Sequence, residues 1–327
     1  MSPSRLAIAA ALAALMLVPG CGGSGQGDPA PKPPPVARPQ DFPKPGGKTI
    51  AQMRKRYAAG GPVLAPSVSQ LQPGTNRFGF GLFDRARAQI ADAPVVLYVA
   101  NTAGGPARGP YPAHFESLHV QPQYLSRSVS SDPTAAKSVY VADLHFPKAG
   151  RYETFGLARL DDRLVAATPA GPALNVLAKG GVPDVGQRPP RIHTPTKNSV
   201  GGDLAKIDTR DPHSTMHDSD FYDVLGKKPI MLLFATPALC QSRVCGPVVD
   251  IAEQVKAQHP DDAKWIDMEI YNDNQVDQGF RPQVSAFNLP TEPWLFAIDR
   301  HGRVAARIEG AYSARELEAA LQKAVKG

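Results

Sequence analysis

The chemistry most clearly suggested by this sequence lies in two cysteines, Cys240 and Cys245, which are separated by four residues. A cysteine thiolate attacks disulfides, and two neighbouring cysteines can close a disulfide of their own, so such a pair can exchange disulfides with another protein. Residues five positions apart on a regular helix hold their sulfurs too far apart to bond. A disulfide between these two therefore requires Cys240 to lie on a loop, or the first helical turn to be distorted.

The hydrophobic pattern of residues 216–327 indicates which elements must position this pair. An apolar run at 228–235 predicts a strand buried on both faces, and a helix with a solvated face that carries Asp250 and Glu253 is expected from about 240 to 259. The elements expected after it are a strand at 265–271, a hairpin of 294–298 and 303–309, and a final helix that the capping box Ser313–Glu316 begins. A buried strand that leads into a helix and then into a strand favours a right-handed crossover and a parallel pair.

This order of elements, with a cysteine at the first junction of strand and helix, resembles the thioredoxin superfamily over residues 216–327. Two local matches are the segment 232–240, which resembles the strand and active-site entry, and the segment 292–302, which resembles the cis-proline, edge strand and glycine turn of exported reductases. The resemblance implies an α/β fold and a thiol-disulfide oxidoreductase that acts on protein thiols or disulfides without a cofactor. It also implies that Pro293 is the cis-proline, with Pro290 as the second choice.

The cysteine motif departs from the Cys-x-x-Cys of that family, because four residues separate Cys240 from Cys245. The distance from the strand places Cys240 in the nucleophile position, although Cys245-Gly-Pro-Val offers a second register in which the resolving cysteine is lost. A helix N-terminus and the charge of Arg243 would both lower the pKa of the Cys240 thiol, and Cys245 would resolve the mixed disulfide. Pro293 would keep the neighbouring backbone open to a substrate strand, with Thr236 and Trp294 beside the redox site.

Two further interpretations of the cysteine pair remain open. A permanent disulfide would stabilise the start of the helix, and a short loop of this kind contributes about 2–3 kcal/mol. Alternatively, the pair resembles that of copper chaperones of the Sco type, which bind copper through two cysteines and a distant histidine. No histidine stands in 280–292, and His213 and His217 are expected to be a solvated pair on a linker, so no metal site is predicted and copper is kept only as an alternative partner.

The N-terminus indicates export. Arg5 precedes an apolar stretch at 6–18, which is shorter than the roughly 20 residues of a spanning helix. The following Val-Pro-Gly-Cys ends at Cys21 and resembles a bacterial lipobox. The resemblance implies that residues 1–21 are a signal peptide and that Cys21 carries a lipid anchor on the outer face of the cytoplasmic membrane. The alternative is a plain secretory signal with an incidental cysteine. With Cys21 lipidated, the two remaining cysteines form an even pair in an oxidising compartment.

The remainder of the chain divides into a tether, a β-rich domain and a linker. Residues 22–62 are rich in proline and glycine, as are residues 179–215, and both stretches are expected to lack regular structure. Short alternating strands with Pro/Gly turns in 63–178 predict a β-sandwich. The phrase Phe-Pro-Lys-Ala-Gly-Arg-Tyr at 146–152 resembles turns of bacterial immunoglobulin-like modules. This domain is expected to act as a spacer or to bind a partner.

Composition agrees with an ordinary folded protein of about two domains. The chain has 327 residues, of which 42% are hydrophobic, and a net charge of +6 that is scattered along the sequence. No nucleic-acid motif accompanies the basic residues, so nucleic acid is not expected as a partner. The fold class predicted for the whole chain is an α/β thioredoxin-like C-terminal domain preceded by an all-β immunoglobulin-like sandwich.

Overall fold

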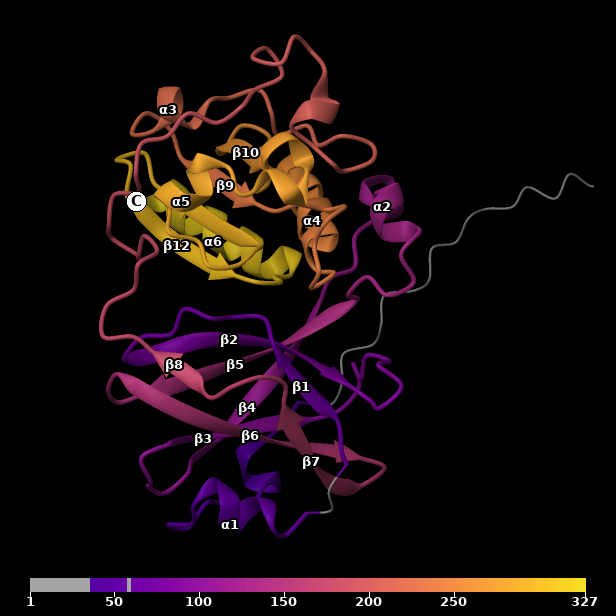
Figure 1. The fold of residues 1–327 in the computed structure, drawn as a ribbon, viewed down its shortest axis with the longest axis vertical. Coiled ribbons are helices and arrows are strands. Elements are labelled where there is room, and N and C mark those ends of the chain that lie inside the picture. The colour runs from indigo at the N-terminus through magenta and orange to yellow at the C-terminus, as the bar shows by residue number, and fades with distance from the viewer. Residues whose placement is uncertain (1–35, 58–59) are drawn as a thin grey trace, which may run out of the picture.

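The computed structural model describes residues 36–57 and 60–327 (Figure 1). The predicted signal peptide, the predicted lipidation site Cys21 and the first part of the tether lie outside these residues. The described chain forms two β-rich halves, a barrel and a four-stranded sheet with helices, which pack on each other in Figure 1. Within the described ranges, no helix combines the length and the apolar character that crossing a bilayer requires.

The N-terminal half is built on a closed barrel. Its strands are β1 (Val63–Pro66), β2 (Gly74–Phe83), β3 (Val95–Asn101), β4 (Arg108–Ser117), β5 (Ser138–Phe146), β6 (Gly150–Leu160), β7 (Arg163–Pro169) and β8 (Leu174–Val176). The sheet runs in the order β3-β4-β5-β2-β1-β7-β6-β8, and an additional pairing of β3 with β6 closes seven of the strands into a ring. The β1–β7 pair is parallel and the other pairs are antiparallel.

Alternation along the strands fills the barrel with aromatic and aliphatic side chains. Phe78 and Phe80 of β2, Leu97 of β3 and Tyr140 of β5 are among those buried in its interior. Burial of such large apolar groups is the main stabilising contribution to a barrel of this size.

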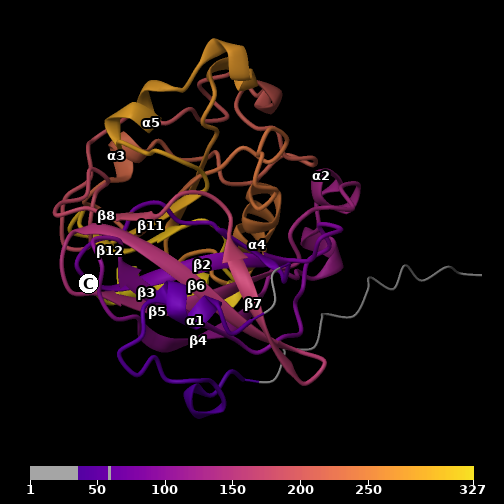
Figure 2. The same ribbon diagram turned by 60° about the horizontal axis from the view of Figure 1, so that its bottom comes forward.

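A short N-terminal segment covers part of the outside of the barrel. It contains the 3-10 helix η1 (Pro39–Asp41) and the helix α1 (Ile50–Arg54), which begins at a capping box formed by Thr49 and Gln52. Phe42 and Ile50 are buried against the outward-facing Tyr98 and Phe155. Figure 1 shows α1 at the end of the barrel remote from the four-stranded sheet, and Figure 2, in which this end comes forward, shows α1 in front of the barrel strands. This part of the expected tether therefore belongs to the folded body.

The C-terminal half contains a mixed sheet of four strands. They are β9 (Ile230–Phe234), β10 (Lys264–Met268), β11 (Trp294–Ile298) and β12 (Val304–Glu309), in the order β10-β9-β11-β12. β9 and β10 are parallel and are connected by α4 (Cys245–Gln258), whereas β11 is antiparallel to both β9 and β12. The chain ends in α6 (Ala314–Lys326).

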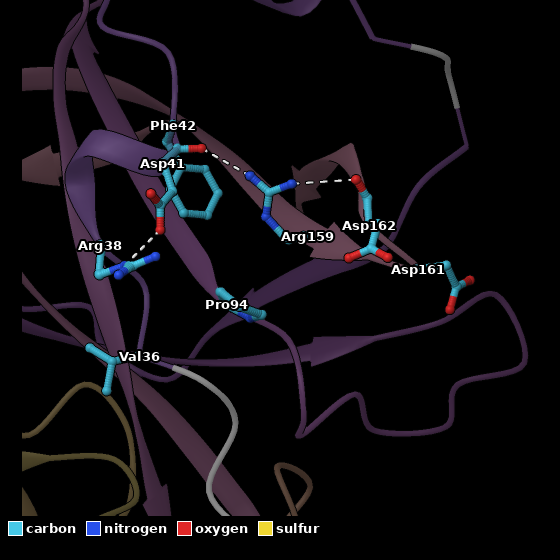
Figure 3. Close-up of a pocket in the computed structure, with 8 residues that line it drawn as sticks. All are labelled: Val36, Arg38, Asp41, Phe42, Pro94, Arg159, Asp161 and Asp162. Carbon is cyan, nitrogen blue, oxygen red and sulfur yellow. Dashed lines mark hydrogen bonds and ion pairs between the residues drawn. The ribbon is translucent and has the colours of Figure 1, made fainter.

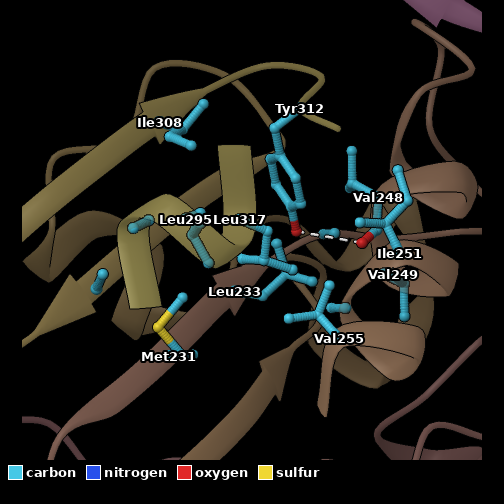
Figure 4. Close-up of a cluster of buried hydrophobic side chains, with 14 of the residues drawn as sticks. Met231, Leu233, Val248, Val249, Ile251, Val255, Leu295, Ile308, Tyr312 and Leu317 are labelled. Atoms are coloured by element: carbon cyan, nitrogen blue, oxygen red, sulfur yellow. Dashed lines mark hydrogen bonds between the residues drawn. The ribbon is translucent and has the colours of Figure 1, made fainter. Parts of the chain in front are cut away.

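Helices α4 and α6 lie between this sheet and the barrel. Figure 4 shows Leu233, Ile251 and Leu317 in the apolar cluster that joins the sheet to both helices, and Val141 on the outer face of β5 belongs to the same cluster. The other sheet face packs against α3 (Phe221–Val224) and α5 (Pro282–Ala286). The short α2 (Arg127–Ser130) extends from the barrel, between β4 and β5, to α4 (Figure 1).

Buried polar contacts also hold the two halves together. The Arg77 guanidinium of β2 donates to the Glu316 carboxylate at 2.7 Å and to the carbonyl of Ala311. Glu116 of β4 accepts from Ser313 and Arg315 at the start of α6. The residues of the linker that follows β8, 179–215, are irregular except for η3 (Leu204–Lys206), and they pack along the C-terminal half.

The predicted fold class is wrong. The chain is mostly β, its N-terminal half is a closed seven-stranded barrel instead of an immunoglobulin-like sandwich, and an α/β thioredoxin-like class does not describe it. The six helices in the described ranges are short, and only α4 and α6 exceed five residues. Strands that alternate between Pro/Gly turns are typical of both sandwiches and barrels. The ring is closed by the pairings of β1 with β7 and of β3 with β6. These pairings join segments that are distant in the sequence, so no local sequence pattern indicates them.

Several local predictions are confirmed. The apolar run at 228–235 forms β9, the strands β11 and β12 form the expected hairpin, and the Ser313–Glu316 capping box begins α6. The expected parallel pair is β9 with β10. The resemblance of residues 216–327 to the thioredoxin superfamily therefore rests on local motifs. The barrel neither confirms nor excludes this resemblance.

Candidate active site

Cys240 and Cys245 form a disulfide in the structure, with 5.9 Å between their Cα atoms. Cys240 lies on the loop after β9, and α4 begins at Cys245, so the geometric requirement derived from the spacing is met by the loop. The side chain of Cys245 is fully buried, whereas Cys240 is only partly buried. The Sγ of Cys240 is therefore the sulfur that a partner thiol can reach.

The local chain explains why the loop adopts this shape. Arg243 has a positive φ of 60°, and its carbonyl accepts a hydrogen bond from the backbone N–H of Ala136 in the barrel half. Pro247 falls in the first turn of α4, where its missing N–H costs no helical hydrogen bond. A side chain at Gly246 would place its Cβ 2.7 Å from Val129 of α2, so only glycine allows the two helices to approach this closely.

A cleft of about 510 Å³ opens beside the disulfide. One wall is the loop 237–247, including Cys240, and the other wall is the segment 128–135 between β4 and β5. The barrel half therefore contributes one wall of the candidate active site.

The helix N-terminus stabilises a different cysteine from the one predicted. We expected Cys240 at this position, but α4 begins five residues later, at Cys245. The N-cap residue Val244 makes no side-chain capping bond, so its side chain does not occupy the first backbone N–H groups of α4. These groups and the positive end of the helix dipole lie at Cys245, which would be the leaving group in an attack on Cys240.

Arg243 does not supply a free charge to the disulfide as expected. Its guanidinium donates to the carboxylate of Asp132 at 3.0 Å, and both side chains are partly exposed in the same cleft. The pair links the cysteine loop to the barrel half. The hydroxyl of Ser242, by contrast, lies 3.2 Å from the Sγ of Cys240.

Glu292 is the site residue that sequence reasoning missed. An oxygen of its carboxyl group and the sulfurs of both cysteines all lie within 4.8 Å of one another. Its Oε2 is buried and has no hydrogen-bond partner among the described residues. Burial and the nearby charge of Glu269 raise the pKa of Glu292 to about 8, and hydrogen bonding to Thr236 lowers it in part. The signal in the sequence was its place directly before Pro293, where the resemblance drew attention to the proline alone.

Of the other predicted site residues, Pro293 and Thr236 lie at the site and Trp294 does not. The Glu292–Pro293 peptide bond is cis, as expected for Pro293, and the Pro293 carbonyl accepts from the N–H of Gly310 at 2.9 Å. Thr236 is fully buried, and its hydroxyl accepts from the backbone N–H of Ile270 at 3.1 Å. Trp294 is buried on the opposite sheet face, where it stacks on Phe296 and does not line the cleft.

A larger hollow of about 640 Å³ lies on the barrel beside η1 (Figure 3). Both of its arginines are already engaged: Arg38 pairs with Asp41 at 2.8 Å, and Arg159 donates to the backbone carbonyls of Asp41 and Asp162. No cysteine or histidine is present among its lining residues in the described chain. These contacts stabilise the fold around the hollow, and we do not consider it a candidate active site.

Comparison with known proteins adds no assignment, since no family model matches the chain and no curated protein matches it. The functional interpretation therefore rests on the chemistry of Cys240, Cys245 and Glu292. After reduction, these three residues would offer two sulfurs and one oxygen to a metal ion. In the copper-binding alternative, they would be the ligands.

The raised pKa of Glu292 predicts how stability depends on pH. The folded chain keeps this proton to about pH 8, whereas the unfolded chain loses it near 4.5, so the folded state binds more protons between these values. The free energy of unfolding should therefore fall as pH rises from about 4.5 to 8. Glu292→Gln should recover on the order of 3 kcal/mol at pH 8 and change little at pH 4.

Urea unfolding of wild type and Glu292→Gln across this pH range measures the effect. Part of the slope should remain in the variant, because burial raises the pKa of Glu269 to about 7. Identical slopes for the two proteins would show that Glu292 is ionised in the folded chain.

Proposed function

We propose that the chain exchanges disulfides with other proteins through Cys240 and Cys245. The observation that carries the proposal is the asymmetry of the disulfide. Cys240 lines an open cleft, while Cys245 is buried at a helix N-terminus beside the Glu292 carboxyl group, whose pKa is raised to about 8. A purely structural disulfide needs neither an accessible sulfur nor a proton donor. Thiol-disulfide exchange needs both, together with a stabilised leaving thiolate.

The arrangement supports the following sequence of steps. A substrate thiolate attacks the Sγ of Cys240, the disulfide breaks, and its electron pair leaves with Cys245 while a mixed disulfide forms on Cys240. The Glu292 carboxyl group donates its proton to the Cys245 thiolate. A second substrate thiol returns a proton to Glu292 and attacks the substrate sulfur of the mixed disulfide, and Cys240 leaves as a thiolate that takes a proton from solvent.

Two electrons thereby pass from a substrate dithiol to the cysteine pair, and the reverse sequence reduces a substrate disulfide. Catalysis of proton transfer by a positioned carboxyl group typically contributes about 10²–10⁴-fold. A pKa of about 8 suits Glu292 to proton transfer, because the carboxyl group can both donate and accept a proton near neutral pH.

The setting proposed for this activity is the outer face of the cytoplasmic membrane. The apolar stretch at 6–18 and the lipobox-like sequence that ends at Cys21 support export and lipid anchoring. An oxidising compartment keeps paired cysteines available for exchange with exported proteins.

The reduction potential of the cysteine pair tests the proposal. The full chain is equilibrated in graded thiol buffers and its free thiols are trapped, with the Cys240→Ser/Cys245→Ser double variant as background. We expect a potential between about −270 and −120 mV, the range of known exchange proteins. A value below about −300 mV would show a structural disulfide. A pair that stays reduced in oxidising buffer would favour metal binding.

A further inference from the structure

A second group of buried polar side chains lies at the edge of the four-stranded sheet. Asp267 belongs to the edge strand β10, whose backbone pairs with the preceding linker through the N–H of Asp267 and the carbonyl of Met216. Asp208 and His217 come from that linker, which had been expected to be solvated and irregular. His217 is instead 97% buried, at 3% exposure, so the expected solvated pair of His213 and His217 is wrong for this residue.

The three side chains converge. One donor atom from each of Asp208, His217 and Asp267 lies within 4.8 Å of the other two. The Nε2 of His217 lies within hydrogen-bond distance, 3.2 Å, of the Oδ2 of Asp208, which also accepts from the backbone N–H of Ser214. Two ligands that each stand about 2.1 Å from one zinc ion at a tetrahedral angle are separated by roughly 3.4 Å, so this spacing suits a shared cation.

Two buried side-chain atoms of the cluster have no hydrogen-bond partner in the described part of the chain. The Oδ1 of Asp267 is buried and has no hydrogen-bond partner among the described residues, and the same holds for the Nδ1 of His217.

Arg210, the buried cation from the same linker, is already engaged. Its guanidinium donates to Asp250 at 2.8 Å and to the carbonyls of Pro212 and Tyr124. A bound cation would supply a partner for the buried carboxylate oxygen of Asp267, which lies beside a second carboxylate and an imidazole.

We propose that Asp208, His217 and Asp267 bind one divalent first-row transition-metal ion, with Zn²⁺ as the best match. One imidazole nitrogen and two carboxylate oxygens form a donor set that zinc accepts at about 2.0–2.2 Å. His213, whose Nδ1 is 3.9 Å from the same Asp208 oxygen and which is partly exposed, supplies the fourth ligand from the solvent side. The ion fixes the linker to β10 and removes the repulsion between the two carboxylates. The site uses none of the residues of the disulfide site and stands independently of the proposed exchange activity.

Zinc binding to the full chain tests the site, with the Cys240–Cys245 disulfide kept closed so that no thiolate competes. The chain is stripped with a chelator and titrated with zinc by calorimetry. We expect one zinc ion per chain and a zinc-dependent rise in Tm. His217→Gln and Asp267→Asn should each weaken zinc binding by more than about 100-fold, since loss of a ligand exceeds the effect of a supporting residue. His259→Gln is the matched control, because His259 also pairs with an aspartate, Asp262, at 2.9 Å but lies at the surface.

Asp267→Asn separates metal binding from a purely structural role. Without metal, the substitution replaces a buried carboxyl group by an amide of nearly the same size, so the Tm of the stripped variant should stay close to that of wild type. With zinc, the rise in Tm seen for wild type should be lost. The proposal is overturned if wild type binds no zinc with the disulfide closed, or if Asp267→Asn and His217→Gln bind zinc as His259→Gln does.

Discussion

Replacing Cys240 by serine is expected to abolish disulfide exchange, with a loss of at least about a thousandfold in rate, because it removes the only sulfur among the described residues that line the cleft. Cys245→Ser should behave differently. Its Cys240 thiol can still attack a substrate disulfide, but no second sulfur can resolve the product. A mixed disulfide with the substrate should therefore accumulate.

Reduction of a protein disulfide by the pre-reduced chain measures the loss, and non-reducing electrophoresis detects the trapped species. Cys21→Ser is the matched control, since it makes the same change at the remaining cysteine of the chain and should leave the rate in solution unaltered. If Cys240→Ser keeps its activity and Cys245→Ser loses it, the nucleophile is Cys245, in the second register noted from Cys245-Gly-Pro-Val. If both keep it, the proposed function is wrong.

The sequence was sufficient where a local pattern determines the structure. The apolar run that forms β9 and the capping box at Ser313 are set by neighbouring residues, and both were predicted. The spacing of the two cysteines limited a disulfide to two geometries, Cys240 on a loop or a distorted first helical turn, and the structure has the loop. The start of α4 was placed five residues too early because Leu239 and Cys240 continue the apolar character of the strand into the loop.

Features that depend on distant contacts were not predicted. Closure of the barrel requires β3 to meet β6 and β1 to meet β7, and each strand alone would suit a sandwich equally well. Glu292 lies beside the disulfide, and its pKa is raised, only because the fold buries it there, which no spacing in the sequence reveals. The wall of the cleft that comes from 128–135 likewise arises from packing between the two halves.

The buried charges of α4 show the same limitation and lead to the largest expected effect on stability. Asp250 was predicted on a solvated helix face, yet it is 1% exposed. Its Oδ1 accepts from Arg210 at 2.8 Å, and its Oδ2 accepts from the backbone N–H and the hydroxyl of Ser126 at 3.0 Å. One carboxylate thus joins α4, the linker and the barrel half.

Asp250→Ala should lower the free energy of unfolding by about 3–5 kcal/mol, because it leaves the buried Arg210 guanidinium without a counter-charge. Urea unfolding measures the loss. Asp262→Ala is the control: it removes an exposed carboxylate that follows the C-terminal end of α4, and it should cost less than about 1 kcal/mol.

The double variant Arg210→Met/Asp250→Leu distinguishes the two origins of this cost. If the penalty comes from the uncompensated charge, removing both charges and filling the space should restore most of the stability lost in Asp250→Ala. If the double variant is as unstable as the single one, the hydrogen bonds from Ser126 and from the Arg210 guanidinium to the carbonyls of Tyr124 and Pro212 carry the stability instead. A loss below about 1 kcal/mol in Asp250→Ala would contradict both explanations, since an unpaired guanidinium at 5% exposure cannot be solvated without local opening of the linker.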